Sequence, residues 1–436
     1  MERKMLNVGI DFSKNRADVG LFGPNGEIIS KHTPFRNSQT GYNLFKEHIL
    51  EAMKTNDLEE INISGEATSY YWMPFFMTIS KDVALNEYDL HPFLLNPKWV
   101  SWYKKCFAPQ HKTDSEDPLF IAERTRTSQP VHEWTYDESW FMHRLLTRFR
   151  FHLKQGLTRE KNFYQAYLFV LNSAYTQQKP FRDVFGSTSA HILADLGQLS
   201  QFSKMDDHEL AEYLQKTSRT NLNDSLENAR RLKKVAEESF QLDSGLSDVL
   251  QRILNMTMQY IKFIEEMIKE VDKCIAEKAK KLPEVAILRS IPGIGPVFSN
   301  GIAAEIGGIS RFLAGQKYDQ RKKRIRNKNL RDADASVAKY AGLWWPRNAS
   351  GNFESDQRKL SKTGNRYLRY YLIEAADRLR QWSPVYDEYY QKKFAEVRKF
   401  AHKRALVLTA RKSIRLYVGL LHRLEPYRPH EVCIRN

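Results

Sequence analysis

Val-Gly-Ile-Asp-Phe-Ser-Lys-Asn, residues 8–15, places an aspartate at the end of a short apolar run. The run is typical of a buried strand that ends at Asp11. A second stretch, Ile-Asn-Ile-Ser-Gly-Glu at residues 61–66, predicts another strand, which leads to Glu66 in the same way. In an open α/β sheet, ligands bind outside the carboxyl ends of the strands. We therefore expect these two carboxylates to meet at one edge of a sheet.

A third acidic segment follows in Lys-Thr-Asp-Ser-Glu-Asp-Pro, residues 112–118. Asp114 and Asp117 would share a helix face if one helix ran through both. Because proline is tolerated only in the first turn of a helix, Pro118 predicts a helix that begins just after Ser115 as its N-cap. Asp114 would then lie just before the helix. The alternative, in which both acids lie at the helix start only because the positive end of the helix dipole stabilises their charge, stays open.

Carboxylates that converge from separate segments are what a hard divalent cation requires. Mg²⁺ takes oxygen ligands in a near-octahedral shell. Two such ions, about 3.5–4 Å apart, can stabilise the attacking and leaving oxygens of an in-line displacement at phosphorus. The four acids therefore predict a Mg²⁺ or Mn²⁺ site for phosphoryl transfer on a nucleic acid, with Asp11, Glu66, Asp114 and Asp117 as metal ligands.

Strand and helix patterns alternate through the first part of the chain. Residues 5–33 predict strands joined by a turn in Gly-Pro-Asn-Gly-Glu. A helix over 41–54, an aromatic helix through Tyr70, Trp72 and Phe76, a strand near 93–96 and a helix after Asp117 follow. This alternation predicts an α/β domain. We expect it to end near residues 127–130.

The net charge of +16 is unevenly distributed. Residues 1–126 hold 15 basic and 17 acidic residues, a balance of −2, so residues 127–436 carry +18. Lys and Arg neutralise phosphates and release counterions. Polyanion binding is therefore predicted for the later part of the chain, although charge alone does not distinguish DNA from RNA or a membrane surface.

The cysteines and the hydropathy pattern indicate a reducing compartment. Cys106, Cys274 and Cys433 have no paired spacing, so neither a disulfide framework nor a zinc site is expected. We find no signal-peptide pattern and no run of about 18 apolar residues that could span a bilayer. These observations predict a cytoplasmic protein without a membrane partner.

Residues 137–281 predict an almost wholly helical region with one long apolar stripe. The stripe steps by three and four residues through Leu246, Val249, Ile253, Met256, Tyr260, Phe263, Met267, Val271 and Cys274. This spacing is typical of a coiled-coil seam. Its partner would be the helix around 141–164 or a second subunit, and an ordinary core helix is equally compatible with the pattern.

The last region begins near residue 283 and carries two features that suit nucleic acid. Ile-Pro-Gly-Ile-Gly-Pro, residues 291–296, predicts a helix-hairpin-helix-like element, in which Gly293 and Gly295 would let backbone N–H groups approach a phosphate. A simple turn between helices is the alternative. Residues 317–331 hold eight basic residues in fifteen, with Asp319 as the only acid. We expect a solvated loop or arm that binds a polyanion, through Arg321, Lys322, Lys323, Arg324 and Arg326.

Seven motifs in this order resemble those of a known family. They are IDFSK (10–14), GEATSYYW (65–72), LNPKWV (95–100), KTDSED (112–117), IPGIGP (291–296), YAGLWWPRNASGNF (340–353) and LSKTGNRYLRYYL (360–372). The order is similar to that of the DEDD transposases of the insertion sequence 110 family. The resemblance covers most of the chain. Pro118, where the family has a small helix former, and the basic stretch 317–331, which looks like an insertion, depart from the family pattern.

The resemblance implies a prokaryotic, metal-dependent DNA recombinase. It implies an RNase H-like (RuvC-like) catalytic domain over 1–130, a helical coiled-coil assembly region over 131–282 and a helical transposase domain over 283–436. It also implies donor and target DNA, a noncoding bridge RNA that pairs with both, and a homo-oligomer, a dimer or tetramer, in which the acidic domain of one subunit meets the serine domain of another.

The resemblance also assigns residues. Carried over by motif, Asp11, Glu66, Asp114 and Asp117 are metal ligands, and Ser350 is a nucleophile that forms a covalent 5′-phosphoserine intermediate with DNA. From the residues alone, Ala-Ser-Gly-Asn around Ser350 is a good turn. The spacing of four polar residues downstream suits phosphate contacts from a loop and a helix start: Lys362, Asn365, Arg366 and Arg369.

Two other functions remain compatible with the sequence. In the first, the protein is a hydrolytic metal nuclease or junction resolvase, in which water attacks the phosphate and Ser350 is only a turn residue. In the second, it is a nucleic-acid-binding scaffold whose acidic site is inactive.

Overall fold

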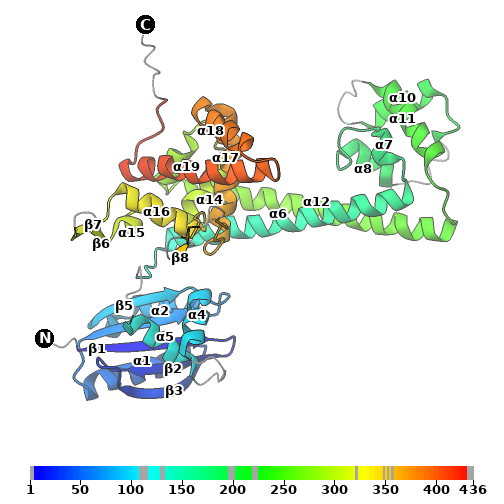
Figure 1. Ribbon diagram of the computed structural model, residues 1–436. Coiled ribbons are helices and arrows are strands. Elements are labelled where there is room, and N and C mark those ends of the chain that lie inside the picture. Colours follow the sequence, from blue (N-terminus) through cyan, green and yellow to red (C-terminus); the bar gives the residue numbers. More distant parts are fainter. Residues whose placement is uncertain are drawn as a thin grey trace, which may run out of the picture. The chain divides into compact units, whose positions relative to one another are not determined.

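The chain divides into two units, Met1–Glu138 and Ser139–Asn436, each with its own set of internal contacts. The computed structural model describes residues 4–107, 116–127, 133–194, 202–218, 224–319, 323–346, 349–350, 353–354 and 358–429 (Figure 1).

The first unit is built on a mixed five-stranded sheet in the order β3-β2-β1-β4-β5. The strands are β1 (Met5–Phe12), β2 (Arg16–Phe22), β3 (Ile28–Arg36), β4 (Glu60–Glu66) and β5 (Asp89–Leu95). β2 is antiparallel to β1 and β3, whereas β4 runs parallel to β1 and β5. Apolar residues of β1 and β4, among them Val8, Ile10 and Ile63, are buried. The predicted α/β class is confirmed for this unit.

In the described part of this unit, five helices accompany the sheet. They are α1 (Gln39–Thr55), α2 (Met73–Lys81), α3 (Val83–Asn86), α4 (Pro97–Phe107) and α5 (Asp117–Thr127). The aromatic helix predicted through Tyr70 is wrong at its start, because α2 begins only at Met73. Pro74 occupies its first turn, and Ser69 has a φ of 55° in the turn before it. Pro118 lies in the first turn of α5, as the sequence predicts.

Two long antiparallel helices run between the two helical groups of the second unit (Figure 1). α6 (Glu138–Leu171) and α12 (Ser244–Ala279) lie side by side (Figure 1). Their buried residues share one hydrophobic cluster. Arg150 pairs with Asp272 and Lys161 with Glu265 along the contact, which fixes the antiparallel register. The cluster continues into α7 (Tyr175–Gln178), α8 (Ser187–Ala194), α10 (Asp207–Thr217) and α11 (Ser225–Glu238).

Most of the apolar stripe predicted on α12 is not the surface that contacts α6, although Val271 near its end is buried in the cluster that the two helices share. The helix buries a neighbouring stripe instead: Leu250, Leu254, Met258, Ile261, Ile264 and Ile268. On the predicted stripe, Met256 is 70% exposed, Tyr260 50% and Phe263 57%. Of the two partners that the sequence suggests, the α6 helix does not cover this part of the stripe.

The rest of the second unit is a helical body around a separate core. Its helices are α13 (Pro283–Arg289), α14 (Pro296–Ile306), α15 (Ser310–Leu313), α16 (Leu330–Ala341), α17 (Arg366–Trp382), α18 (Pro384–Ala395) and α19 (Ala401–Arg423). Large buried side chains such as Tyr371 on α17 and Tyr417 on α19 fill this core.

The basic run is folded, which corrects the expectation of a solvated loop. Its described residues form a hairpin of β6 (Gln316–Asp319) and β7 (Arg324–Asn327). Lys317 Nζ and Arg326 Nη1 reach the two oxygens of Asp332 at 2.8 and 2.6 Å. The hydrogen bond from Arg326 holds the pKa of Asp332 well below its usual range. Asp332 lies one residue beyond the basic run 317–331. The carboxylate that holds the base of the hairpin was therefore not included when the charges of the run were counted.

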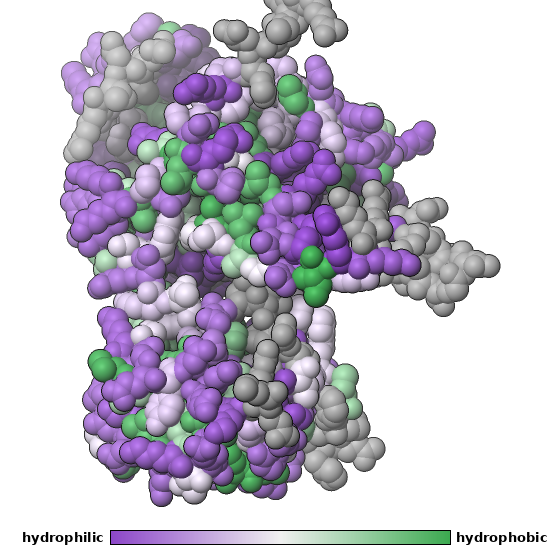
Figure 2. All heavy atoms as spheres, turned by 90° about the vertical axis from the view of Figure 1, so that its left-hand side faces the viewer, coloured by the Kyte–Doolittle hydropathy of each residue, from purple (hydrophilic) through white to green (hydrophobic). Residues whose placement is uncertain are grey.

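Hydrophilic residues predominate on the face shown in Figure 2, with smaller hydrophobic groups between them. In the described part of the chain, no helix combines the length and the apolar character that crossing a bilayer needs.

Candidate active site

Three small residues form one row across the sheet and let α5 lie directly on it. Gly9 of β1 pairs with Gly20 of β2 and with Ser64 of β4. A Cβ atom at Gly9 would collide with the carbonyl oxygen of Pro118, and one at Gly20 would lie 2.9 Å from Leu119. This close approach is why the two glycines are needed. The start of α5 is therefore brought against the carboxyl end of β1.

The acidic residues form the next row on the same face of these strands. Asp11 pairs with Asp18 across β1 and β2. Ile10 pairs with Gly65, so Asp11 and Glu66 follow at the ends of two adjacent parallel strands. Asp117 is the first residue of α5. The structure thus brings Asp11, Glu66 and Asp117 to one edge of the sheet, while Asp114 lies outside the described residues.

The environment of Asp11 shows that these carboxylates interact. Burial raises the pKa of its carboxyl group, the positive charge of Lys104 lowers it, and the nearby charges of Glu66, Asp117 and Asp18 raise it further. Lys104 Nζ lies 2.8 Å from Asp117 Oδ2. The site therefore keeps several negative charges at close range and balances them with one lysine from α4.

Asp18 is an acid that the sequence reasoning missed. It is 5% exposed, and its Oδ1 lies 2.9 Å from Nε2 of His32 on β3. A single carboxylate among the apolar residues that follow Arg16 in the strand Arg-Ala-Asp-Val-Gly-Leu-Phe was the available signal. Asp18 adds negative potential beside Asp11. Its own carboxylate is already in contact with His32.

The donor chemistry of this edge fits a hard divalent cation, because oxygens of Asp and Glu are the ligands that Mg²⁺ and Mn²⁺ prefer. Within the described ranges, however, no three His, Cys, Asp or Glu side chains already stand close enough together to hold a metal ion. The ammonium group of Lys104 supplies the positive charge beside Asp117.

Replacing Lys104 with methionine should strengthen divalent-metal binding. Lys104 competes for Asp117, and its charge repels any cation that approaches Asp11. We expect the affinity for Mn²⁺ to rise by about tenfold, which corresponds to about 1.4 kcal/mol. Titration calorimetry or the Mn²⁺ electron paramagnetic resonance signal would measure it. Lys105→Met, at the exposed neighbour, is the control, and equal affinities for both variants and the parent protein would contradict the prediction.

Ser350 belongs to the second unit. It ends the short strand β8 (Ala349–Ser350), which pairs with β9 (Phe353–Glu354). The backbone of Ser350 is thus held in a hairpin, where the sequence alone suggested only a turn. The acidic edge and Ser350 lie in different units of the chain.

Several predicted nucleic-acid contacts serve the fold. The side chain of Asn365 caps α17 by accepting from the N–H groups of Tyr367 and Leu368, and its Nδ2 donates to Glu305 at 2.6 Å. Arg369 donates to the carbonyl oxygens of Ala341 and Lys362, each at 3.0 Å. These contacts favour structural roles for Asn365 and Arg369.

Other predicted contacts remain accessible. Lys362, Arg366, Lys323 and Arg324 are exposed, whereas Arg321 and Lys322 lie outside the described residues. The two glycines of the turn before α14 differ. A Cβ atom at Gly293, where φ is 83°, would lie 2.6 Å from the Trp382 ring, whereas Gly295 faces open space. Only Gly295 leaves room for a phosphate beside the helix start.

A buried ion cluster joins α6 to this region. The Glu305 side chain has no exposed surface, and Arg148 contacts both of its oxygens at 2.7 and 2.8 Å. Burial alone would raise the pKa of Glu305, but Arg148, Arg144 and Asn365 together hold it below its usual value. Glu305 therefore connects α6, α14 and the start of α17.

Replacing Glu305 with alanine should destabilise the second unit by about 3–5 kcal/mol, because Arg148 and Arg144 would be left largely buried without their counter-ion. Thermal or denaturant unfolding would measure the loss. Glu374→Ala, at an exposed glutamate of α17, should change stability by no more than about 0.5 kcal/mol. Similar losses for the two variants would contradict the prediction.

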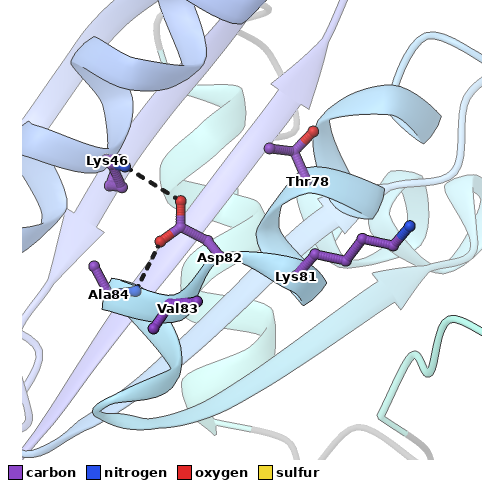
Figure 3. A pocket seen from close by; sticks show the side chains of 6 residues that line it. All are labelled: Lys46, Thr78, Lys81, Asp82, Val83 and Ala84. Carbon is purple, nitrogen blue, oxygen red and sulfur yellow. Dashed lines mark hydrogen bonds and ion pairs between the residues drawn. The ribbon is translucent and has the colours of Figure 1, made fainter.

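The pocket in Figure 3 is separate from the acidic edge. It is lined by Lys46, Thr78, Lys81, Asp82, Val83 and Ala84. Asp82 accepts from the N–H of Ala84 at 3.0 Å and from the Tyr42 hydroxyl at 2.9 Å, and Lys46 lies 3.4 Å away. Asp82 follows α2 and precedes β5, so it lies at the amino ends of the parallel strands, whereas the acids lie at the carboxyl ends. Its carboxylate serves the local fold.

Comparisons with protein-family models find two matches, and each includes motifs on which the resemblance rests. The DEDD transposase model of the IS110 family, described as "Transposase", matches residues 8–172. The model described as "Transposase IS116/IS110/IS902 family" matches residues 324–391. A comparison with curated proteins finds no significant match.

The fold and the two matches define a transposase. The chain belongs to the insertion sequence 110 family, whose members cleave and rejoin DNA in the transposition of insertion sequences and depend in general on a divalent metal. The predicted family is therefore confirmed. The first match contains Asp11, Glu66 and Asp117, and the second contains Ser350.

Proposed function

We propose that this protein recombines DNA through a covalent phosphoserine intermediate, with Ser350 as the nucleophile and an RNase H-like first unit as the metal-binding half of the active site. One observation carries the proposal: Asp11 is held close to Glu66 and Asp117 although burial, and then the repulsion from these carboxylates, raise its pKa. A fold keeps such a cluster at a cost in stability, which is typical of functional sites. The mixed order of the sheet supports the RNase H-like assignment.

The proposed reaction conserves the energy of the broken phosphodiester. The Ser350 Oγ forms a bond to phosphorus, the bond from phosphorus to the 3′ oxygen breaks, and the serine proton ends on the released 3′ hydroxyl. Attack by a 3′ hydroxyl from another strand reverses these steps and releases Ser350. A serine hydroxyl is a weak nucleophile until its proton is removed. When bound, a divalent cation would neutralise charge on the phosphate and ease that removal.

The residues of the first unit have distinct tasks in this scheme. Asp11, Glu66 and Asp117, with Asp114, would hold Mg²⁺ or Mn²⁺. The ammonium group of Lys104 would leave Asp117 as the ion binds, since the two cations compete for the same carboxylate. This displacement would be the step that makes the acidic edge competent.

The proposal includes donor DNA, target DNA and a bridge RNA that pairs with both. The positive charge of the chain beyond residue 126 supports contact with these polyanions. Exposed cations of the second unit, such as Lys323, Arg324, Lys362 and Arg366, are the candidate phosphate contacts. Separate hydrophobic cores support a division of the chain beyond residue 130 into a helical assembly region, 131–282, and a transposase domain, 283–436.

Mass spectrometry of the trapped intermediate tests the function directly. The full chain is incubated with Mg²⁺, its flanking noncoding RNA and matched DNA, then denatured and digested. We expect a peptide containing Ser350 with a nucleotide joined through a 5′ phosphate. Cleaved DNA without any protein-bound nucleotide would instead support a hydrolytic nuclease, and salt-dependent binding without cleavage would support a scaffold.

The exposed stripe of α12 supports a homo-oligomer. Met256, Tyr260 and Phe263 repeat at seam spacing and are at least half exposed. A second copy of the same helix, in a coiled coil, would bury this stripe and bring the acidic unit of one subunit to the serine of another.

Introducing charge on this stripe should dissociate the oligomer. We expect Met256→Glu/Phe263→Glu to convert the protein to a monomer in light scattering coupled to size-exclusion chromatography, because carboxylates in the seam would be desolvated. The helix should remain folded, since both side chains face away from the α6 contact. Lys262→Glu, at an exposed position on another face of α12, is the matched control. A double variant that keeps the parent's mass would contradict the prediction.

A further inference from the structure

Exposed aromatic rings of the first unit gather at the edge of the sheet that carries the acids. Among its described residues, the rings classed as exposed are Tyr70 (49%), Tyr71 (43%), Trp99 (36%) and Trp102 (51%). Tyr70 and Tyr71 follow shortly after Glu66 at the end of β4, and the two tryptophans lie on α4 after the end of β5. Large apolar groups that gather at a surface often mark a binding site.

Helix α4 is fixed in position and turns its tryptophans outward. Asn96 caps its start by accepting from the N–H of Lys98 at 2.9 Å. Val100 is fully buried, and Lys104, one turn later, reaches Asp117. Trp99 and Trp102 are three residues apart, so they lie on one face of the helix, next to the face that carries Val100 and Lys104. The same helix therefore contacts the acidic site and presents two rings to solvent.

Cations accompany these rings. Lys98 Nζ lies 5.2 Å from the centre of the Trp102 ring, and the Arg124 guanidinium lies 5.9 Å from that of Trp99. α4 carries three lysines and no acidic residue, in a unit whose first 126 residues have a balance of −2. Aromatic faces with adjacent cations bind single-stranded nucleic acid, because unpaired bases stack on the rings while the cations contact the backbone.

We propose that the Trp99–Trp102 face of α4 stacks on unpaired DNA bases that flank the phosphate to be cut. Bases inside a duplex stack on each other and offer no free face, so this surface selects a separated strand. The proposal rests on the proposed function of the acidic edge, because the strand cut there is DNA. It adds that the strand enters the site unpaired and that tryptophans of the first unit, besides cations of the second, hold it.

Photocrosslinking of the full chain tests this surface without any cleavage. A single-stranded DNA with 5-iodouracil in place of thymine, irradiated with the protein in EDTA, should crosslink to the tryptic peptide 99–104, Trp-Val-Ser-Trp-Tyr-Lys. We expect the yield of this crosslinked peptide to fall about tenfold in Trp99→Leu/Trp102→Leu, as loss of base stacking implies. Trp382→Leu is the matched control, since Trp382 is a 68% exposed tryptophan of the second unit. Equal thermal unfolding of the variants would confirm that the fold is kept.

Three results would overturn the proposal. They are crosslinks that avoid peptide 99–104, equal yields of that peptide from the corresponding duplex, and preferential crosslinking of a single-stranded RNA of the same sequence. The assay contains no metal and requires no reaction at Ser350, so Ser350→Ala should crosslink like the parent protein. Failure of the covalent chemistry and failure of base stacking are therefore distinguished.

Discussion

Asp11→Asn should abolish strand cleavage and joining while making the metal-free protein more stable. The substitution removes a ligand from the centre of the acidic edge, and we expect a rate loss of about 10³-fold or more in an assay with Mg²⁺ and matched nucleic acids. It also removes a partly buried charge that Glu66 and Asp117 repel. We therefore expect the midpoint of thermal unfolding without metal to rise by about 2–4 °C, or roughly 1 kcal/mol.

The pH dependence of this gain separates its cause from better packing. Burial and neighbouring carboxylates raise the pKa of Asp11 in the folded state above its ordinary value of 3.8. The parent protein therefore loses stability as pH rises from 3.8 through the raised pKa, because the folded state must release a proton that it binds more tightly than the unfolded chain does. The advantage of Asp11→Asn should be greatest at neutral pH and shrink as pH falls toward 3.8. An advantage that does not vary with pH would exclude the electrostatic cause.

Asp57→Asn provides a matched control for both measurements. Asp57 lies in the same unit, but its side chain is 89% exposed and pairs with Lys4 at the surface. We expect neither a loss of activity nor a gain in stability from that substitution. A variant at Asp11 that keeps full activity would refute the role of the acidic edge in covalent recombination and in hydrolysis alike.

The acidic edge could be predicted because strand ends are local signals. Short apolar runs before Asp11 and Glu66 place both residues at the carboxyl ends of strands, and parallel pairing of β1 with β4 brings such ends together. The sequence marks Asp18 as an unusual carboxylate in a strand, but its position beside Asp11 could not be foreseen, since it depends on which residue of an antiparallel neighbour stands opposite Asp11. Lys104 was missed for a related reason, because its contact with Asp117 spans the stretch between α4 and α5.

The long helix shows what periodicity can and cannot establish. The spacing of three and four predicts a helix and an apolar stripe on α12, and both are present. However, α12 carries two adjacent apolar stripes, and α6 covers the one that includes Ile261 and Ile264. The spacing of apolar residues in one helix shows which of them lie on the same face. Which of these faces packs against α6 depends on the complementary surface of α6, which is far away in the sequence.

Polar residues near the start of α17 show a similar limit. Asn365 was predicted to contact a phosphate because it stands among basic residues at a helix start. Its amide instead caps the helix and donates to the buried Glu305, which precedes it by 60 residues. The same residue types at a helix start suit both a helix cap and a phosphate contact, so a short-range pattern cannot choose between them. The contact with the buried Glu305, far away in the sequence, favours the cap.

Ser350→Ala should separate the covalent mechanism from hydrolysis. If Ser350 is the nucleophile, the variant loses both cleavage and joining, by about 10³-fold or more, because the Ser350 Oγ is the protein group that bonds to phosphorus in the intermediate. Metal binding should remain, since the acids lie in the other unit. A hydrolytic nuclease would continue to cleave at the parent's rate, because water would attack and the serine would only form a turn.

The control for this experiment is a second serine of the same unit. Ser361 precedes the Lys-Thr-Gly-Asn stretch, and its Oγ accepts from the N–H of Thr363 at 3.3 Å, so its hydroxyl has a local structural contact. We expect Ser361→Ala to keep cleavage and joining within about tenfold of the parent. Asp11→Asn and Ser350→Ala together then divide the possibilities. Loss in both supports the covalent mechanism, loss in Asp11→Asn alone indicates metal-dependent hydrolysis, and a parent protein that binds DNA without cutting it is a scaffold.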